Sequence, residues 1–446
     1  MSDKSYSSKL TRPSPLFIGV DLGTSGCRAI AIDSAGTIKA QAKIHYANKN
    51  HKLQTPDDWW QATQTVLHTI TSKIHHQHIQ SIAIDGTSGT ILLCDHAGRP
   101  LTPAVMYDEQ HAKEQAAFLQ NYAPTNSPVL SPSSGLAKVL WLLEHHKPEG
   151  KFHIIHQADW VAGQLCRHFN FSDSNNALKT GFDPVNNIWP LWLLDLFKER
   201  KINPASLPNV FSPGSFITNI HPHVATELGL PIDVEIIAGT TDSTAAFMAS
   251  GVDKIGQAVT SLGSTLVLKV ISDVPINHPD HGVYSQPYGK HWLVGGASNS
   301  GGSVLSYYFS DEQMLTLTKQ LNPVVSTNLN YYPLLKTGER FPINDANLSP
   351  RITPKVDNDL VFFQGLLEGI ADIENKGYKL LEHLGAPYPS SVVTSGGGAI
   401  NNAWQQIREQ KLGVPVSVAT HTAAAYGAAK LAAKNHQQNK RDKYDQ

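Results

Sequence analysis

One pattern occurs in both halves of the chain: a short apolar strand, a polar turn of glycine, serine and threonine, and a second strand. In the first half the apolar run Leu16–Val20 breaks at Asp21-Leu-Gly-Thr-Ser-Gly26, and a new strand-like run covers 28–33. In the second half Leu262-Gly263-Ser264 separates two similar runs. Short apolar runs bounded by such turn residues predict paired strands. A unit used twice predicts a fold built from two copies of one supersecondary element.

The chain between and after these units alternates helices with strands, which predicts an α/β fold. Thr55-Pro56 is a typical helix start, and the helix is expected to reach about Ser72. Further strands are expected over 81–84, 235–238 and 391–394, and further helices over 362–384 and 402–412. With a boundary near Asp253, we expect a disordered lead over 1–13, one domain over 14–253, a second domain over 254–435 and a polar tail over 436–446.

Composition excludes several classes of function. The 446 residues exceed one ordinary core, and the formal net charge of -1 argues against nucleic-acid or anionic-membrane partners. No apolar run reaches the roughly 18 residues needed to span a bilayer, and the polar N-terminus does not resemble a secretory signal. The three cysteines, Cys27, Cys94 and Cys166, are widely spaced, which is typical of a reducing compartment. We therefore expect a cytoplasmic protein.

The turn after the first strand has residues that could bind phosphate. Gly23 lets a ligand approach the backbone N–H groups, and Thr24 and Ser25 add hydroxyl donors. Asp21 could hold Mg²⁺ through its water shell, since that ion prefers carboxylate and water oxygens. An ordinary hairpin explains the same residues, so this turn alone does not decide between the two.

Two later turns have the same character. Gly263, Ser264 and Thr265 lie where the repeated unit places its own turn. Gly396-Gly-Gly398 lies between a strand and a helix, where amide groups and the helix dipole favour anions. Either could be a flexible turn, but the three together predict a nucleotide phosphate chain held between two domains.

Asp242 follows Gly239-Thr-Thr and precedes a helix of small residues. It could simply cap that helix, a role in which aspartate is favoured. It could also be a general base that takes a proton from a hydroxyl group as the hydroxyl attacks a γ-phosphoryl group. Because a helix N-terminus stabilises a carboxylate, we expect Asp242 to be ionised at neutral pH.

Taken in order, these motifs resemble the FGGY family of carbohydrate kinases over about 17–433. The matching segments are Ile18-Gly-Val-Asp-Leu-Gly-Thr-Ser25, Ser134-Gly-Leu-Ala-Lys-Val-Leu-Trp141, Gly239-Thr-Thr-Asp242, Ser261-Leu-Gly-Ser264, Gly338-Glu-Arg-Phe-Pro342, Glu368-Gly-Ile-Ala371, Gly396-Gly-Gly398 and Ala424-Ala-Tyr-Gly-Ala428. The resemblance implies two actin-like, ribonuclease H-like domains that close on ATP and a sugar.

The resemblance also implies roles for individual residues. Asp242 would be the catalytic base, and Asp108 would bind sugar hydroxyls. The remaining residues would lie on the Mg-ATP side: Asp21, Gly23, Thr24, Ser25, Gly263, Ser264, Thr265, Gly397, Gly398 and Asn401.

The choice of sugar depends on one segment that departs from many relatives. Asp85-Gly-Thr-Ser-Gly-Thr90 is closer to the Asp-x-Thr pattern of ribulose kinases than to the segments of xylulose and glycerol kinases. This segment and the short length of the chain together resemble the compact plant and cyanobacterial D-ribulose kinase branch. Ser88 could face the sugar or the γ-phosphate, or be a plain turn serine. Thr422 stands where relatives often have Glu, so the role of this position on the nucleotide side stays open.

We therefore expect phosphorylation of D-ribulose, with D-xylulose next and another sugar or polyol after it. A non-catalytic sugar or nucleotide sensor would be expected to lack Asp21 or Asp242, and both are present. A filament or chaperone-like ATPase of the same fold would not require Asp108 or the segment around Lys138. The oligomeric state stays open, with a homodimer as the default expectation.

Overall fold

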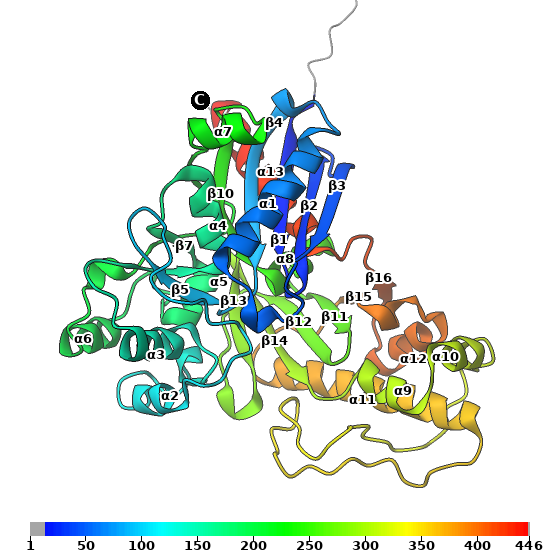
Figure 1. Cartoon of the computed structure of the whole chain (residues 1–446). Helices are drawn as coiled ribbons and strands as arrows, with labels where there is room; N and C mark the ends of the chain where they lie inside the picture. The colour runs from blue at the N-terminus through cyan, green and yellow to red at the C-terminus, as the bar shows by residue number, and fades with distance from the viewer. Residues whose placement is uncertain (1–13, 445–446) are drawn as a thin grey trace, which may run out of the picture.

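Two six-stranded sheets form the framework of the computed structural model, which describes residues 14–444 (Figure 1). The expected lead over 1–13 and the last two residues lie outside the described part. The first sheet has the order β3-β2-β1-β4-β10-β9, with β1 (Leu16–Leu22), β2 (Gly26–Asp33), β3 (Ile38–His45), β4 (Ile79–Gly86), β9 (Phe216–Asn219) and β10 (Glu235–Thr241). The second has the order β13-β14-β12-β11-β15-β16, with β11 (Gln257–Leu262), β12 (Leu266–Ser272), β13 (Tyr284–Tyr288), β14 (His291–Ser298), β15 (Ser391–Ser395) and β16 (Val416–Val418).

The two sheets repeat one arrangement of strands. β1 runs antiparallel to β2 and parallel to β4, and β11 runs antiparallel to β12 and parallel to β15. The match continues outward, because β2 is antiparallel to β3 as β12 is to β14, and β4 is parallel to β10 as β15 is to β16. The repeated unit predicted from sequence is therefore confirmed.

Helices cover the two sheets where their sequence signals place them. Thr55 forms a capping box with Asp58 at the start of α1 (Pro56–Thr71), close to the predicted limits. α4 (Gln157–Cys166) and α7 (Pro222–Leu228) also belong to the first half, and α11 (Asp359–His383) and α12 (Asn402–Leu412) to the second. The second half also contains α9 (Gly302–Tyr308) and α10 (Asp311–Thr318). No helix within 14–444 is long and apolar enough to cross a membrane.

An insertion between β4 and β10 forms a smaller lobe with its own apolar cluster, at the left of Figure 1. Its elements are β5 (Ile91–Cys94), α2 (Lys113–Leu119), α3 (Gly135–His146), β6 (His153–His156) and α6 (Leu191–Glu199). β7 (Phe171–Asp173), α5 (Ser174–Ala177) and β8 (Asn209–Phe211) connect the lobe back to the first sheet.

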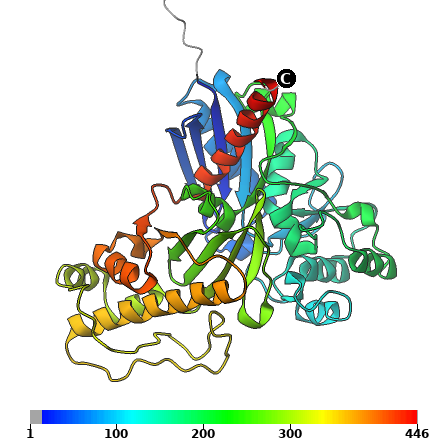
Figure 2. The same ribbon diagram turned by 180° about the vertical axis from the view of Figure 1, so that it is seen from behind.

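Two helices cross between the halves. α8 (Asp242–Ala249) follows the first sheet, but its Phe247 packs against the second sheet. α13 (Ala424–Tyr444) follows the second sheet but packs on β1 and β4, as Figure 2 shows from behind. Glycines allow the contact: a Cβ on Gly19 would lie 2.0 Å from the carbonyl oxygen of Ala425, and one on Gly427 would lie 1.8 Å from that of Ala245.

The crossing places the last part of the expected second domain on the first sheet. Residues 424–435, assigned from sequence to the second domain, lie on the first sheet, and the expected tail from 436 continues as helix α13 to Tyr444. The expected boundary near Asp253 falls between α8 and β11.

Candidate active site

Three aspartates come together at one edge of the first sheet. β1, β4 and β10 are parallel neighbours, so their carboxyl ends share that edge. Asp21 lies opposite Asp85 in the strand register, Thr240 lies on the other side of Asp85, and Asp242 begins α8 just beyond. The structure thus brings Asp21 and Asp242 together as candidates and adds Asp85, which the sequence analysis used only as part of the segment that predicts the sugar.

Burial and mutual repulsion control the charge of these carboxyl groups. Burial raises the pKa of Asp242 to about 6, opposed by the N–H of Ser243, which donates to its Oδ1 at 2.6 Å. Asp85 is fully buried, and burial together with the charges of Asp21 and Asp242 raises its pKa well above its usual value. Burial also raises the pKa of Asp21. A carboxylate with a pKa near 6 suits a general base at neutral pH.

The donor set at this edge fits a hard divalent cation. Carboxylate oxygens are what Mg²⁺ prefers, and both oxygens of Asp85 lack a partner that meets hydrogen-bond geometry. Within the described residues, no group of three His, Cys, Asp or Glu side chains is arranged to hold a metal ion directly. Contact through water, as expected for Asp21, therefore suits this edge better than a closed protein cage.

Glycine occurs at three turn positions where neither backbone nor packing requires it. Across residues 14–444, every glycine except three either has a positive φ or would place a Cβ within 3.4 Å of another atom. The exceptions are Gly23, Gly263 and Gly397, one in each predicted phosphate turn. At Gly397 nothing lies within 4 Å of the Cβ position. Space left free at all three turns is what close approach of a ligand to the backbone would require.

The last two of these turns lie side by side at the edge of the second sheet. Ser261 and Ser395 are opposite each other in the register of β11 and β15. A Cβ on Gly396 would lie 2.5 Å from the carbonyl oxygen of Leu262, so the two loops touch. The hydroxyl groups of the predicted turn residues make no hydrogen bond to any described residue; these are Thr24, Ser25, Ser264 and Thr265.

Two of the predicted nucleotide-side residues also have local structural roles. The side chain of Asn401 accepts from the N–H of Trp404 at 2.9 Å and donates to Thr318 at 3.0 Å, so it caps α12. A Cβ on Gly398 would lie 2.7 Å from the Trp404 ring, so packing alone explains that glycine.

The predicted sugar-side residues lie on the segments that follow β4 and β5. Ser88 is half-buried, and its hydroxyl has no hydrogen-bond partner within the described chain. Asp108 is exposed and contacts Nε2 of His51 at 3.0 Å. The Asp108 carboxylate is therefore open to a ligand, whereas the Ser88 hydroxyl is buried and has no hydrogen-bond partner within the described chain.

Lys269 was missed from sequence, where it appeared as one residue of a strand. It extends from β12 toward α8, and its Nζ lies 3.2 Å from Oγ of Ser243 and 3.0 Å from Oε1 of Gln286. Its charge lowers the pKa of Asp242. A lysine within an apolar strand was the available signal, because lysine is rarely buried without a partner.

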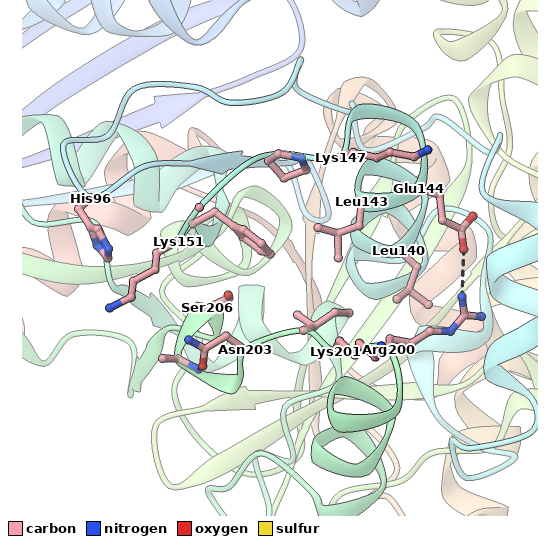
Figure 3. A pocket seen from close by; sticks show the side chains of 15 residues that line it. His96, Leu140, Leu143, Glu144, Lys147, Lys151, Arg200, Lys201, Asn203 and Ser206 are labelled. Atoms are coloured by element: carbon pink, nitrogen blue, oxygen red, sulfur yellow. Dashed lines mark hydrogen bonds and ion pairs between the residues drawn. The ribbon is translucent and has the colours of Figure 1, made fainter.

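A well-defined cavity elsewhere contains none of the predicted residues. It has a volume of about 480 Å³ and lies in the smaller lobe, where α3 and α6 end (Figure 3). Leu140, Leu143 and Arg200 line it, and Arg200 pairs with Glu144. Of its basic residues, Lys147, Arg200 and Lys201 follow the C-terminal ends of α3 and α6, where cations stabilise free carbonyl groups, so the helices themselves account for these three.

Comparisons with known proteins cover nearly the whole chain. The N-terminal domain of the FGGY family of carbohydrate kinases matches residues 16–249, and its C-terminal domain matches 258–436. A xylulose kinase of Staphylococcus xylosus is 23% identical over 94% of this chain and 91% of its own length. The xylulose kinase of Escherichia coli is 25% identical over 94% and 89%.

Solved structures agree with the fold. A xyloylose kinase from Brucella ovis superposes with a TM-score of 0.83 at 22% identity, over 95% of this chain and 91% of that chain. Gluconate kinase from Lactobacillus acidophilus superposes with a TM-score of 0.82 at 21% identity, over 96% and 90%. The α/β fold with two actin-like domains, predicted from sequence, is confirmed.

Proposed function

Because this chain belongs to the FGGY family of carbohydrate kinases, we propose that it transfers the γ-phosphoryl group of Mg-ATP to a ketopentose, with D-ribulose as the leading candidate. The observation that carries the proposal is that equivalent edges of the two sheets carry different residues, carboxyl groups on one and glycine turns on the other. Ionisable Asp242, at the start of α8, lies beside Asp21 of the first sheet, and the second sheet presents glycine turns with free space above them.

Both edges contribute to this reaction. Asp242 accepts the proton of the sugar hydroxyl as that oxygen forms its bond to the γ-phosphorus and the bond to ADP breaks. The backbone N–H groups and hydroxyls of the turns around Gly23, Gly263 and Gly397 bind phosphate oxygens. Asp21 would hold Mg²⁺ through water, and the bound ion would supply positive charge to the phosphate oxygens.

The proposal of D-ribulose rests on the segment at the end of β4. Asp85, Thr87 and Ser88 form the Asp-x-Thr-Ser sequence that resembles ribulose kinases, and the Ser88 hydroxyl has no partner of its own. Ser88 and Asp108 would bind sugar hydroxyl groups. A second candidate substrate is D-xylulose, which is favoured by the names of the relatives from S. xylosus and E. coli.

A coupled ADP-release assay over D-ribulose, D-xylulose, ribitol and glycerol, with a sugar-free control, tests the proposal. We expect the highest kcat/KM for D-ribulose. A higher value for D-xylulose would select the second candidate, and a preference for either polyol would contradict the ketose assignment. Equal ADP release without sugar would contradict the kinase reaction, as in an actin-like ATPase.

A further inference from the structure

Lys138, on α3, is a fully buried lysine whose ammonium group is bonded to backbone rather than to an acid. Its Nζ donates to the carbonyl oxygens of Gly89 at 2.9 Å, Met106 at 2.6 Å and Tyr107 at 3.2 Å. An ammonium group has three N–H donors, so each of them has an acceptor here. Lysine is rarely buried this deeply, and a packing role alone would be filled by an apolar side chain.

The three carbonyl groups belong to the two segments that carry the sugar-side candidates. Gly89 directly follows Ser88, and Tyr107 directly precedes Asp108. A direct bond also joins the segments, because the N–H of Tyr107 donates to Oγ1 of Thr90 at 3.0 Å. Lys138 therefore fixes the distance between two segments that come from different parts of the chain.

We propose that Lys138 is a positioning residue that holds Ser88 and Asp108 at the spacing required by the sugar hydroxyls, and so sets the affinity for sugar without touching it. The inference rests on the proposed kinase function. An ordinary structural lysine would instead support the fold and leave the relative KM values for sugar and ATP unchanged.

The charge state of Lys138 makes this role depend on pH. Burial lowers its pKa to about 7, while Glu109 and Asp108 act in the opposite direction and Lys179 adds to the lowering. His156 also faces it, but burial lowers the pKa of His156 to about 3, so that ring is neutral. Above about pH 7 the neutral amine has two N–H donors for three carbonyl groups. We therefore expect the KM for sugar to rise with pH.

The experiment compares the full-length wild type with Lys138→Met and with Lys147→Met, an exposed lysine at the end of the same helix. KM for sugar, KM for ATP and kcat are measured from pH 6 to pH 9. Methionine has no N–H donor, so the carbonyl oxygens of Gly89, Met106 and Tyr107 all lose the bond from Lys138, and loss of a single buried hydrogen bond already corresponds to roughly a tenfold change in affinity. We expect Lys138→Met to raise the KM for sugar by at least about tenfold and to remove its rise with pH, while KM for ATP is unchanged. Lys147→Met should match the wild type.

Several outcomes would overturn the proposal. An unchanged KM for sugar in Lys138→Met, or equal rises for sugar and ATP, would assign the lysine to the fold alone. If that variant does not fold, the wild-type pH series decides, and a KM for sugar that stays constant from pH 6 to pH 9 overturns the inference. A wild type without turnover on any sugar would overturn the kinase proposal and this inference together, whereas an active wild type with an unaffected variant overturns only the role of Lys138.

Discussion

The two sheets share one strand arrangement, yet their equivalent edges carry different chemistry. The ends of β1 and β4 and the residue after β10 provide carboxyl groups, namely Asp21, Asp85 and Asp242. The matching ends of β11 and β15 provide glycine turns around Gly263 and Gly397. The shared arrangement therefore carries an acidic edge on the first sheet and, on the second, a glycine-turn edge that we propose binds phosphate, called the phosphate-binding edge below. Function depends on the residues placed on a fold rather than on the fold itself.

The two halves also differ in whether their buried carboxyl groups form ion pairs. In the second half Glu374 is fully buried and pairs with Arg408, whose Nε and Nη2 donate to it at 2.6 and 2.7 Å. In the first half Asp85 is equally buried, but no described residue forms an ion pair with it. An unpaired buried carboxyl group destabilises a fold unless it is neutral, so its retention at the acidic edge is a sign of function.

The largest expected effect tests the acidic edge. Asp242→Asn keeps the shape of the side chain but cannot accept a proton, so kcat should fall by roughly 10²- to 10⁴-fold in the sugar-dependent assay. The base must be ionised to act, and its pKa is about 6, so wild-type kcat should fall as pH drops through about 6 and stay level above it. Asp233→Asn, in an exposed turn before β10, is the control and should keep full activity. A folded Asp242→Asn enzyme with near wild-type kcat would remove the acidic edge from proton transfer.

The next effect tests the paired charges of the second half. Arg408→Met leaves Glu374 buried without its partner, so the free energy of unfolding should fall by about 3–5 kcal/mol, measured by urea denaturation. Lys411→Met, on the same helix, breaks the partly exposed pair with Asp372 and should cost less than about 1 kcal/mol. Equal effects of the two substitutions would show that burial does not distinguish these ion pairs, and the contrast between the halves would fail.

Much of the fold was predictable because its signals are local. The turn after Leu22, the capping box at Thr55 and the repeated strand pairs each depend on neighbouring residues. The crossing of α13 was not predictable, because it depends on Gly19 and Ala425 meeting from opposite ends of the chain. No local pattern shows which sheet a helix of small residues will cover.

The candidate site was predictable only in part, for a related reason. Asp21 and the glycine turns were found because they end strands in a repeated unit. Asp85 needed the register of β4 between β1 and β10, which places it between Asp21 and the residues before Asp242. Lys138 and Lys269 were visible as lysines in apolar surroundings, but their acceptors come from distant segments.

The smallest expected effect tests the phosphate-binding edge. Gly397 has no atom within 4 Å of its Cβ position and no positive φ, so Gly397→Val should fold normally with an unchanged melting temperature. Its branched side chain would occupy the space above the loop and separate phosphate from the backbone N–H groups, which should raise the KM for ATP by about tenfold. Ser417→Val, at an exposed position of neighbouring β16, should leave that KM unchanged. If Gly397→Val raised the KM for sugar instead, the tasks of the two edges would be exchanged, and if neither KM moved, the free space at this turn would have no role in binding.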